Sequence, residues 1–228
     1  MLRKIFGLMR NARNDIVLPS KEALLWAVGV FLDIVLGDVS GSMEDQGYET
    51  GKTKLMLMRA ALHGFIDAKM QKGMNDPVCV IAYSDNATLC APLLPVLDNA
   101  DRLKQACTQM LALPHQGTYL VKGLQLAVEQ LEQARPLWPG RFLPRLLVYS
   151  DGADASVQPS VLIADNLKRQ GVMIECLGVA KKREDVDEVF LRQIATTDET
   201  GTHYRFLGDP ETLQRTFSQI AHGTLTVE

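Results

Sequence analysis

The segment Asp38–Ser42, with the sequence DVSGS, carries one carboxylate and two hydroxyls at alternate positions. It follows the mostly apolar run 31–36 and precedes an acidic stretch that contains glycine. Asp38, Ser40 and Ser42 therefore stand where a strand ends and a loop begins. Small oxygen ligands of this kind suit a hard cation such as Mg²⁺, which takes an octahedral shell of oxygens. Taken alone, the pattern is also that of a polar turn after a strand.

Two later segments favour the interpretation as a metal site. Thr118 ends the sequence QGT just ahead of a segment with helical spacing, and Asp151 follows the apolar, strand-like run 145–150. In open parallel α/β sheets, binding sites form at the carboxyl ends of strands, near the point where the strand order reverses. If the strands that end at Asp38 and Asp151 are neighbours, the three segments converge on one rim. The sequence alone leaves that adjacency open.

The three segments, DVSGSM at 38–43, QGT at 116–118 and LVYSDG at 147–152, together resemble the metal-ion-dependent adhesion site of the von Willebrand factor A (vWA) family. The resemblance covers about residues 33–221. It implies two hydroxyls that bind the ion directly, a threonine that binds directly or through water, and two aspartates that act directly or through water according to the state of the site. In this sequence those residues are Ser40, Ser42, Thr118, Asp38 and Asp151.

Departures from the family pattern are small. Gln116 replaces a frequent glycine and Ser150 stands where threonine is common, and neither change removes a metal-binding oxygen. The resemblance therefore implies an intact site for Mg²⁺, with Mn²⁺ or Ca²⁺ as alternatives. A site with few directly bound carboxylates keeps residual positive charge and an open coordination position. By the same resemblance, an Asp or Glu of a partner protein fills that position.

The segments that must position these residues alternate between strand-like and helix-like patterns. Apolar spacing predicts helices over 54–72, 99–111, 120–134, 161–170, 186–195 and 210–221, and strands that end at Asp38 or run over 78–83, 145–150 and 172–179. The segment 87–90 is expected to pair beside 78–83, and 202–206 is expected to form a short edge strand. Apolar strands separated by helices predict a doubly wound, mainly parallel α/β sheet covered on both faces, and the resemblance implies the same Rossmann-like fold.

Length and composition predict one ordinary globular domain. We expect it over 31–222, after an N-terminal extension (1–30) that forms a helix and before a C-terminal tail (223–228). The formal net charge of −3, from 24 basic and 27 acidic residues, argues against binding to nucleic acid through phosphate neutralisation. The apolar segment 23–37 is shorter than the ~20 residues of a membrane span, and Asp33 interrupts it. Four scattered cysteines without a C-x-x-C pair favour buried thiols in a reducing compartment, and therefore a cytoplasmic location.

Three enzyme patterns fail on single positions. A P-loop at the GKT sequence 51–53 requires glycine at position 46, which is Gln46. We expect Lys52 and Lys54 to lie instead on the solvated start of a helix. A nucleophile elbow requires serine where Val39 stands, and a phosphatase of the D-x-D type requires a carboxylate where Ser40 stands. We therefore expect no catalysis.

The leading hypothesis is a non-enzymatic, metal-dependent protein-interaction module. Bacterial members of the family often act with a MoxR-type AAA+ ATPase or within stress or defence systems, and the resemblance implies a partner of this kind. Two alternatives stay open: a Mg²⁺-dependent hydrolase of phosphate esters, and a structural subunit with an idle metal site. Turnover that is abolished by Asp38→Ala would favour the hydrolase. Partner binding that persists in Asp38→Ala and Asp151→Ala variants would favour the structural subunit.

Overall fold

The computed structural model describes residues 31–45, 47, 51–73, 75–113, 117–136 and 142–223. The predicted extension over 1–30 and residues 224–228 of the predicted tail lie outside these ranges. The main strands are β1 (Phe31–Asp38), β2 (Pro77–Tyr83), β3 (Ala87–Pro95), β4 (Leu143–Ser150), β5 (Met173–Val179) and β8 (Tyr204–Leu207), and the short strands are β6 (Thr197–Asp198) and β7 (Gly201–Thr202). The helices are α3 (Lys54–Lys72), α4 (Val96–Gln109), α5 (Leu120–Ala134), α6 (Val157–Arg169), α7 (Glu188–Ile194) and α8 (Pro210–His222), with 3-10 turns η1 (Gly41–Glu44), η2 (Met110–Ala112) and η3 (Arg183–Asp185).

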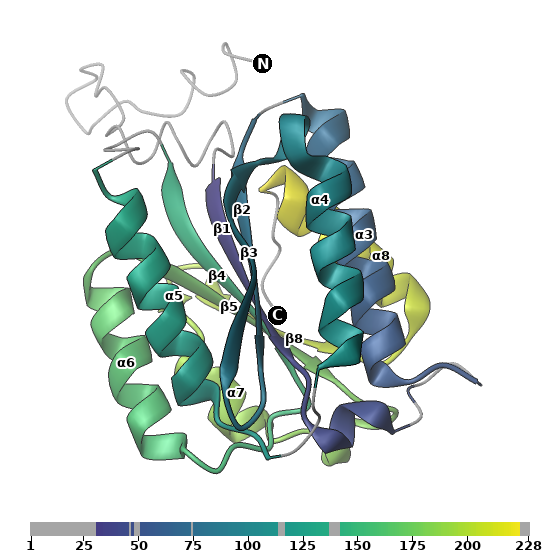
Figure 1. Cartoon of the computed structure of the whole chain (residues 1–228). Helices are drawn as coiled ribbons and strands as arrows, with labels where there is room; N and C mark the ends of the chain where they lie inside the picture. The colour runs from purple at the N-terminus through teal and green to yellow at the C-terminus, as the bar shows by residue number, and fades with distance from the viewer. Residues whose placement is uncertain are drawn as a thin grey trace, which may run out of the picture.

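The centre of the molecule is a six-stranded sheet with the order β3-β2-β1-β4-β5-β8 (Figure 1). Only the β2–β3 pair of this sheet is antiparallel, and the other neighbours run parallel. The predicted mainly parallel α/β sheet is therefore confirmed. The four-residue strand β8 forms one edge, as expected for the short edge strand.

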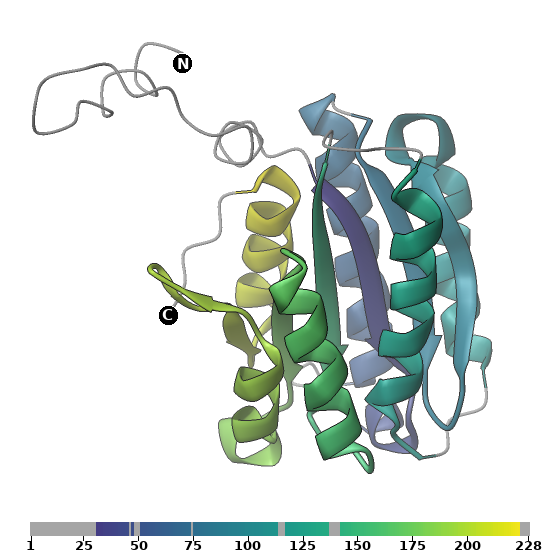
Figure 2. The same ribbon diagram turned by 90° about the vertical axis from the view of Figure 1, so that its left-hand side faces the viewer.

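Helices cover both faces of the sheet. Figures 1 and 2 show α3, α4 and α8 on one side and α5, α6 and α7 on the other. Successive side chains of β1 point to opposite faces, so that Val35 joins the core under α3 while Ile34 and Leu36 join the core under α5. Because both faces are buried, β1 is apolar at almost every position, which explains its continuous hydrophobic pattern.

The strand order reverses between β1 and β4. From β1 the chain proceeds outward to β2 and β3, and then returns to the other side of β1 as β4. Gly37 pairs with Tyr149 across this junction, so that the carboxyl ends of the two strands lie together. The adjacency that the sequence left open is thus present. The reversal point of such a sheet is where ligands bind.

Several element boundaries differ from those predicted. Helices α3 and α5 have the predicted bounds, whereas α6 begins at Val157, four residues early, because Pro159 is accommodated in the first turn. The predicted strand 202–206 is divided at His203 into β7 and β8. Asp187 accepts a hydrogen bond from Phe190 N at 3.0 Å, and this cap delays the start of α7 to Glu188.

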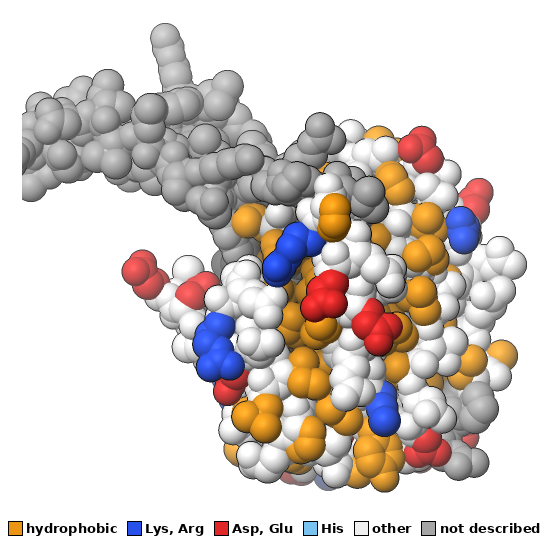
Figure 3. All heavy atoms as spheres, turned by 60° about the vertical axis from the view of Figure 1, so that its left-hand side comes forward, with side chains coloured by type: hydrophobic (Ala, Val, Ile, Leu, Met, Phe, Trp, Pro, Cys, Tyr) orange, Lys and Arg blue, Asp and Glu red, His pale blue; other side chains and the backbone are white. Residues whose placement is uncertain are grey.

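The cysteines are free thiols, and charged side chains are present on the surface, as the composition predicts. Cys79, Cys107 and Cys176 are buried and Cys90 is half-buried, and all four are free thiols, as predicted. Within the described ranges, no helix is both long and apolar enough to cross a membrane. The face in Figure 3 carries basic and acidic side chains among hydrophobic ones.

Candidate functional site

Asp38 is the last residue of β1, and its carboxylate is buried. Its Oδ1 accepts a hydrogen bond from Ser40 N at 2.8 Å, and its Oδ2 accepts one from Ser150 Oγ at 2.7 Å. Ser150 is the last residue of β4, the neighbouring strand. The end of β1 is therefore fastened to the end of β4 through this carboxylate.

The two serines continue from Asp38 into the 3-10 turn η1. Ser40 is buried, and its Oγ lies 3.2 Å from Ser42 Oγ, which is half-buried. Ser40 O accepts a hydrogen bond from Met43 N at 3.0 Å, and the Met43 side chain is fully buried. The turn is thus anchored in the core through Met43, and the hydroxyls of its two serines lie next to each other.

Asp151 follows β4 directly and is also buried. The next residue, Gly152, has a φ of 90°, and its N–H donates to Ser150 Oγ at 2.9 Å. A β-carbon at Gly152 would lie 2.9 Å from Asp187 N, so that only glycine allows this close approach of the two segments. The result is a sharp turn that leaves the Asp151 side chain beside the end of β1.

Thr118 lies on a third segment, just before α5, and is half-buried. Its carbonyl accepts a hydrogen bond from Ala155 N at 2.9 Å. Asp154 Oδ1 accepts from Leu120 N at 3.1 Å and from Ser156 N at 3.0 Å. These bonds join the loop before α5 to the loop after β4.

These hydrogen bonds bring the three segments that carry the five predicted residues to one rim. Asp38, Ser40 and Ser42 are linked by direct hydrogen bonds, Asp151 is linked to them through the adjacent Ser150, and Thr118 is linked through its main chain. Whether these five bind an ion stays a prediction.

Lys54 corrects one prediction. It was expected on a solvated helix start, but it is only 7% exposed, and its Nζ lies 3.0 Å from Asp151 Oδ2. Thr53 caps α3 by accepting a hydrogen bond from Met56 N at 3.2 Å, which makes Lys54 the first helical residue. A lysine at a helix start is usually solvated, so the sequence held no signal of this contact. Ser150 and Asp154 were likewise missed as positioning residues.

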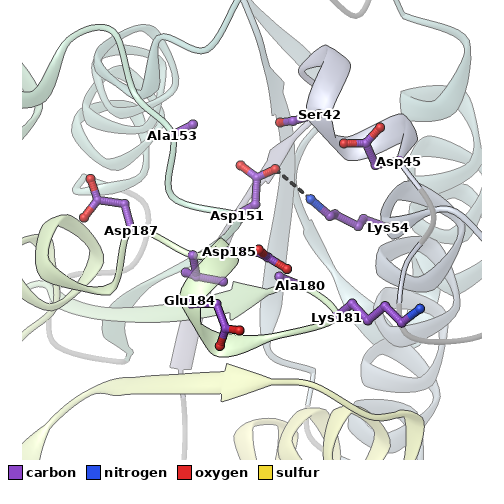
Figure 4. A pocket seen from close by; sticks show the side chains of 11 residues that line it. Ser42, Asp45, Lys54, Asp151, Ala153, Ala180, Lys181, Glu184, Asp185 and Asp187 are labelled. Atoms are coloured by element: carbon purple, nitrogen blue, oxygen red, sulfur yellow. Dashed lines mark hydrogen bonds and ion pairs between the residues drawn. The ribbon is translucent and has the colours of Figure 1, made fainter.

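An open hollow of about 760 Å³ lies over Asp151 (Figure 4). Its charged lining contains five carboxylates and two lysines: Asp45, Asp151, Glu184, Asp185, Asp187, Lys54 and Lys181. Ser42 also lines the hollow. An excess of negative charge around a hollow favours cations inside it.

The electrostatics of Asp38 point the same way. Burial raises the pKa of Asp38 to about 6, although hydrogen bonds from Ser40 and Ser150 lower it, and the charge of Asp151 adds to the rise. Asp151 Oδ1 is buried and has no hydrogen-bond partner in the described structure. A buried carboxylate oxygen without a partner is unfavourable unless an ion or water meets it.

The donor set fits a hard divalent cation. Carboxylate and hydroxyl oxygens are available from Asp38, Asp151, Ser40 and Ser42, and such oxygens suit Mg²⁺, Mn²⁺ or Ca²⁺. Among the described residues, His, Cys, Asp and Glu side chains form no group of three or more that could hold a metal. A metal centre here would therefore depend on the hydroxyls as well as on the carboxylates.

Comparisons with solved structures show the same fold. An aerotolerance-related membrane protein from Bacteroides fragilis is 20% identical, with a TM-score of 0.62 over 83% of this chain and 97% of that one. A von Willebrand factor type A protein from Catenulispora acidiphila is 21% identical, with a TM-score of 0.67 over 85% of this chain and 42% of that one. Manganese-loaded TRAP protein from Plasmodium vivax is 15% identical, with a TM-score of 0.62 over 88% and 76%.

No curated protein sequence matches the chain. The sequence profile of the von Willebrand factor type A domain matches residues 33–219, a range that runs from β1 into α8 and includes all five predicted site residues. That match spans well over half of the 228 residues. The chain belongs to the von Willebrand factor type A domain family.

Proposed function

We propose that this domain is a metal-dependent protein-interaction module that binds an acidic side chain of its partner through Mg²⁺. Domains of the family are protein-interaction and adhesion modules, often metal-dependent. The observation that carries the proposal is Asp151 Oδ1, a buried carboxylate oxygen without a partner, beside a hollow with an excess of carboxylates. The manganese in the TRAP protein supports a divalent ion in a related fold.

Each side chain has a distinct part in this proposal. Ser40, Ser42 and Thr118 would supply neutral oxygens, and Asp38 and Asp151 would supply charge directly or through water. Bound Mg²⁺ supplies a positive centre with an open position for a partner's carboxylate. Ser150 holds Asp38 in place, and Asp154 holds the loops around Thr118, so that the ligands are oriented before an ion arrives.

We also propose that the domain is not an enzyme and that it acts in the cytoplasm. Free thiols suit a reducing compartment. For the partner we propose a MoxR-type AAA+ ATPase, or a component of a stress or defence system, that presents an exposed Asp or Glu. This choice rests on the partners with which bacterial members of the family commonly act.

The first test is direct ion binding. We expect Mg²⁺ and Mn²⁺ to raise the melting temperature of the wild-type protein and EDTA to reverse the rise, because an ion that binds only the folded state stabilises it. Thr118→Ala and Ser42→Ala should lose most of this response. Thr108→Ala, which alters an exposed threonine on α4, is the matched control and should keep it. No response of the wild-type protein to Mg²⁺, Mn²⁺ or Ca²⁺ would contradict the proposal.

The second test concerns the partner. Proteins captured from native lysate on the wild-type domain in Mg²⁺ are compared with those captured in EDTA and on the Thr118→Ala variant. A partner that is lost in both comparisons supports recognition through the ion. A partner retained in both favours a structural subunit, and Mg²⁺-dependent cleavage of a generic phosphate ester by the wild type favours the hydrolase.

A further inference from the structure

Lys54 occupies a fixed position at the rim of the site. It is the first residue of α3, after the capping residue Thr53, and its main-chain N–H donates to Asp45 O at 3.1 Å. These two contacts hold the start of the helix against the loop that follows η1. The long side chain of Lys54 is therefore directed from a rigid element rather than from a free loop.

The Lys54 ammonium group uses only one oxygen of Asp151. The Nζ–Oδ2 distance is 3.0 Å, and the side chains of the two residues are 9% and 5% exposed. The other oxygen, Oδ1, has no hydrogen-bond partner in the described structure. Figure 4 shows Asp151 and Lys54 joined across the hollow, with Asp45 beside them. One oxygen of Asp151 is therefore held by Lys54, and the other oxygen can contact another cation.

A divalent ion at Asp151 would stand close to the Lys54 ammonium. Like charges that lie close together in a largely buried site repel each other strongly, and a divalent ion repels an ammonium more than a second monovalent cation would. Lys54 and the ion therefore compete for the same carboxylate. Asp45, on the same wall of the hollow, offers the ammonium another acidic neighbour when the ion is bound.

We propose that Lys54 is a built-in cation that competes with the divalent ion for Asp151. Its ammonium stabilises the folded protein when no ion is bound, and it lowers the affinity of the site for the ion. This inference rests on the proposed metal binding and concerns its regulation. The two effects are linked, because whatever Lys54 contributes to the ion-free protein is lost when an ion displaces it. Removing the ammonium should therefore weaken the ion-free fold and strengthen ion binding together.

A purely structural lysine would behave differently. If Lys54 only anchored the start of α3, its removal would lower stability equally with and without the ion and would leave the affinity unchanged. If Lys54 oriented Asp151 for the ion, its removal would lower the affinity. The direction of the affinity change therefore separates the three roles.

The experiment titrates MgCl₂ and MnCl₂ into the full chain by calorimetry and measures melting temperatures in EDTA. Lys54→Met keeps the aliphatic stem and removes the charge. Lys54→Arg keeps the charge and should bind the ion about as weakly as the wild type. The matched control is Lys181→Met, which removes an exposed positive charge from the same hollow. Lys54→Gln is measured in parallel in case the methionine variant does not fold.

We expect Lys54→Met and Lys54→Gln to bind Mg²⁺ about ten- to a hundredfold more tightly than the wild type, the range given by the loss of one charge-assisted hydrogen bond. Their melting temperatures in EDTA should fall below that of Lys181→Met, whose ion affinity should change by less than about threefold, as for an exposed charge. Equal or weaker binding by both Lys54 variants would overturn the inference while leaving the proposed function intact. Absence of binding by every protein, the two Lys54 variants included, would overturn both.

Discussion

The two ends of β1 each carry a buried aspartate, but one aspartate is paired with cations and the other accepts hydrogen bonds from neutral groups. Asp33, near the amino end, pairs through Oδ1 with Arg145 Nε at 2.7 Å and through Oδ2 with Lys69 Nζ at 2.6 Å. Asp38, at the carboxyl end, accepts hydrogen bonds from Ser40 and Ser150 and forms no ion pair within the part of the chain that the structure describes. Both carboxylates are completely buried.

The pKa values follow this difference. Burial by itself raises the pKa of Asp33, but the charges and hydrogen bonds of Arg145 and Lys69 outweigh it and leave the pKa lowered. At Asp38 burial prevails and the pKa rises to about 6. The amino end of the sheet is thus neutralised from within. The carboxyl end is left short of positive charge, and this is the end at which the proposed ion would sit.

The largest expected effect separates the two aspartates. Asp33→Asn would leave Arg145 and Lys69 without their shared carboxylate in a buried site, and should lower the free energy of unfolding by about 3–5 kcal/mol. Asp38→Asn, measured in EDTA, removes a buried charge while keeping an acceptor for Ser40 N, and should change that free energy by less than about 1.5 kcal/mol. Urea denaturation of the two variants and the wild type measures both values. Similar losses in the two variants would break the comparison.

A smaller effect is expected from the turn that follows Asp151. Gly152→Ala introduces a side chain at positive φ and a β-carbon 2.9 Å from Asp187 N, and should cost roughly 2–4 kcal/mol. Gly171→Ala is the matched control, because Gly171 has a φ of 82° and open space around its β-carbon position. The two variants share the backbone strain, so their difference in urea denaturation isolates the clash. Equal losses would show that the loops after β4 and before α7 separate easily.

The sequence predicted the parts of the site that lie at strand ends. The apolar runs stop at or just before Asp38 and Ser150, and the end of each run marks where the strand gives way to a loop. Parallel strands and a reversal of their order then bring Asp38 and Asp151 to one edge. Local patterns are enough to locate the strand ends, whereas the adjacency of β1 and β4, which the sequence left open, comes from the structure.

The sequence did not predict the ion pairs. Lys54 and Asp151 are 97 positions apart, and Asp33 and Arg145 are 112 positions apart. Periodicity carries no information on which long side chain reaches which carboxylate, because that depends on the packing of helices on the sheet. Asp33 was therefore interpreted only as an interruption of an apolar run, and Lys54 as solvated. Contacts of this kind require the three-dimensional structure.

An effect smaller than those of Asp33→Asn and Gly152→Ala is expected at Ser150, whose neutral hydroxyl contacts Asp38 where Asp33 has two cations. Its hydroxyl donates to Asp38 Oδ2 at 2.7 Å and accepts from Gly152 N at 2.9 Å. Ser150→Ala therefore removes both hydrogen bonds, one from the carboxylate of Asp38 and one from the main-chain N–H of Gly152. We expect a loss of about 1–2 kcal/mol in EDTA, because a neutral hydroxyl contributes less than an ion pair at a buried carboxylate. Ser150→Thr keeps the hydroxyl and is the control. A loss as large as that of Asp33→Asn would mean that hydrogen bonds alone hold the carboxyl end as firmly as charge holds the amino end, and the contrast between the two ends of β1 would then lie in their chemistry and not in their stability.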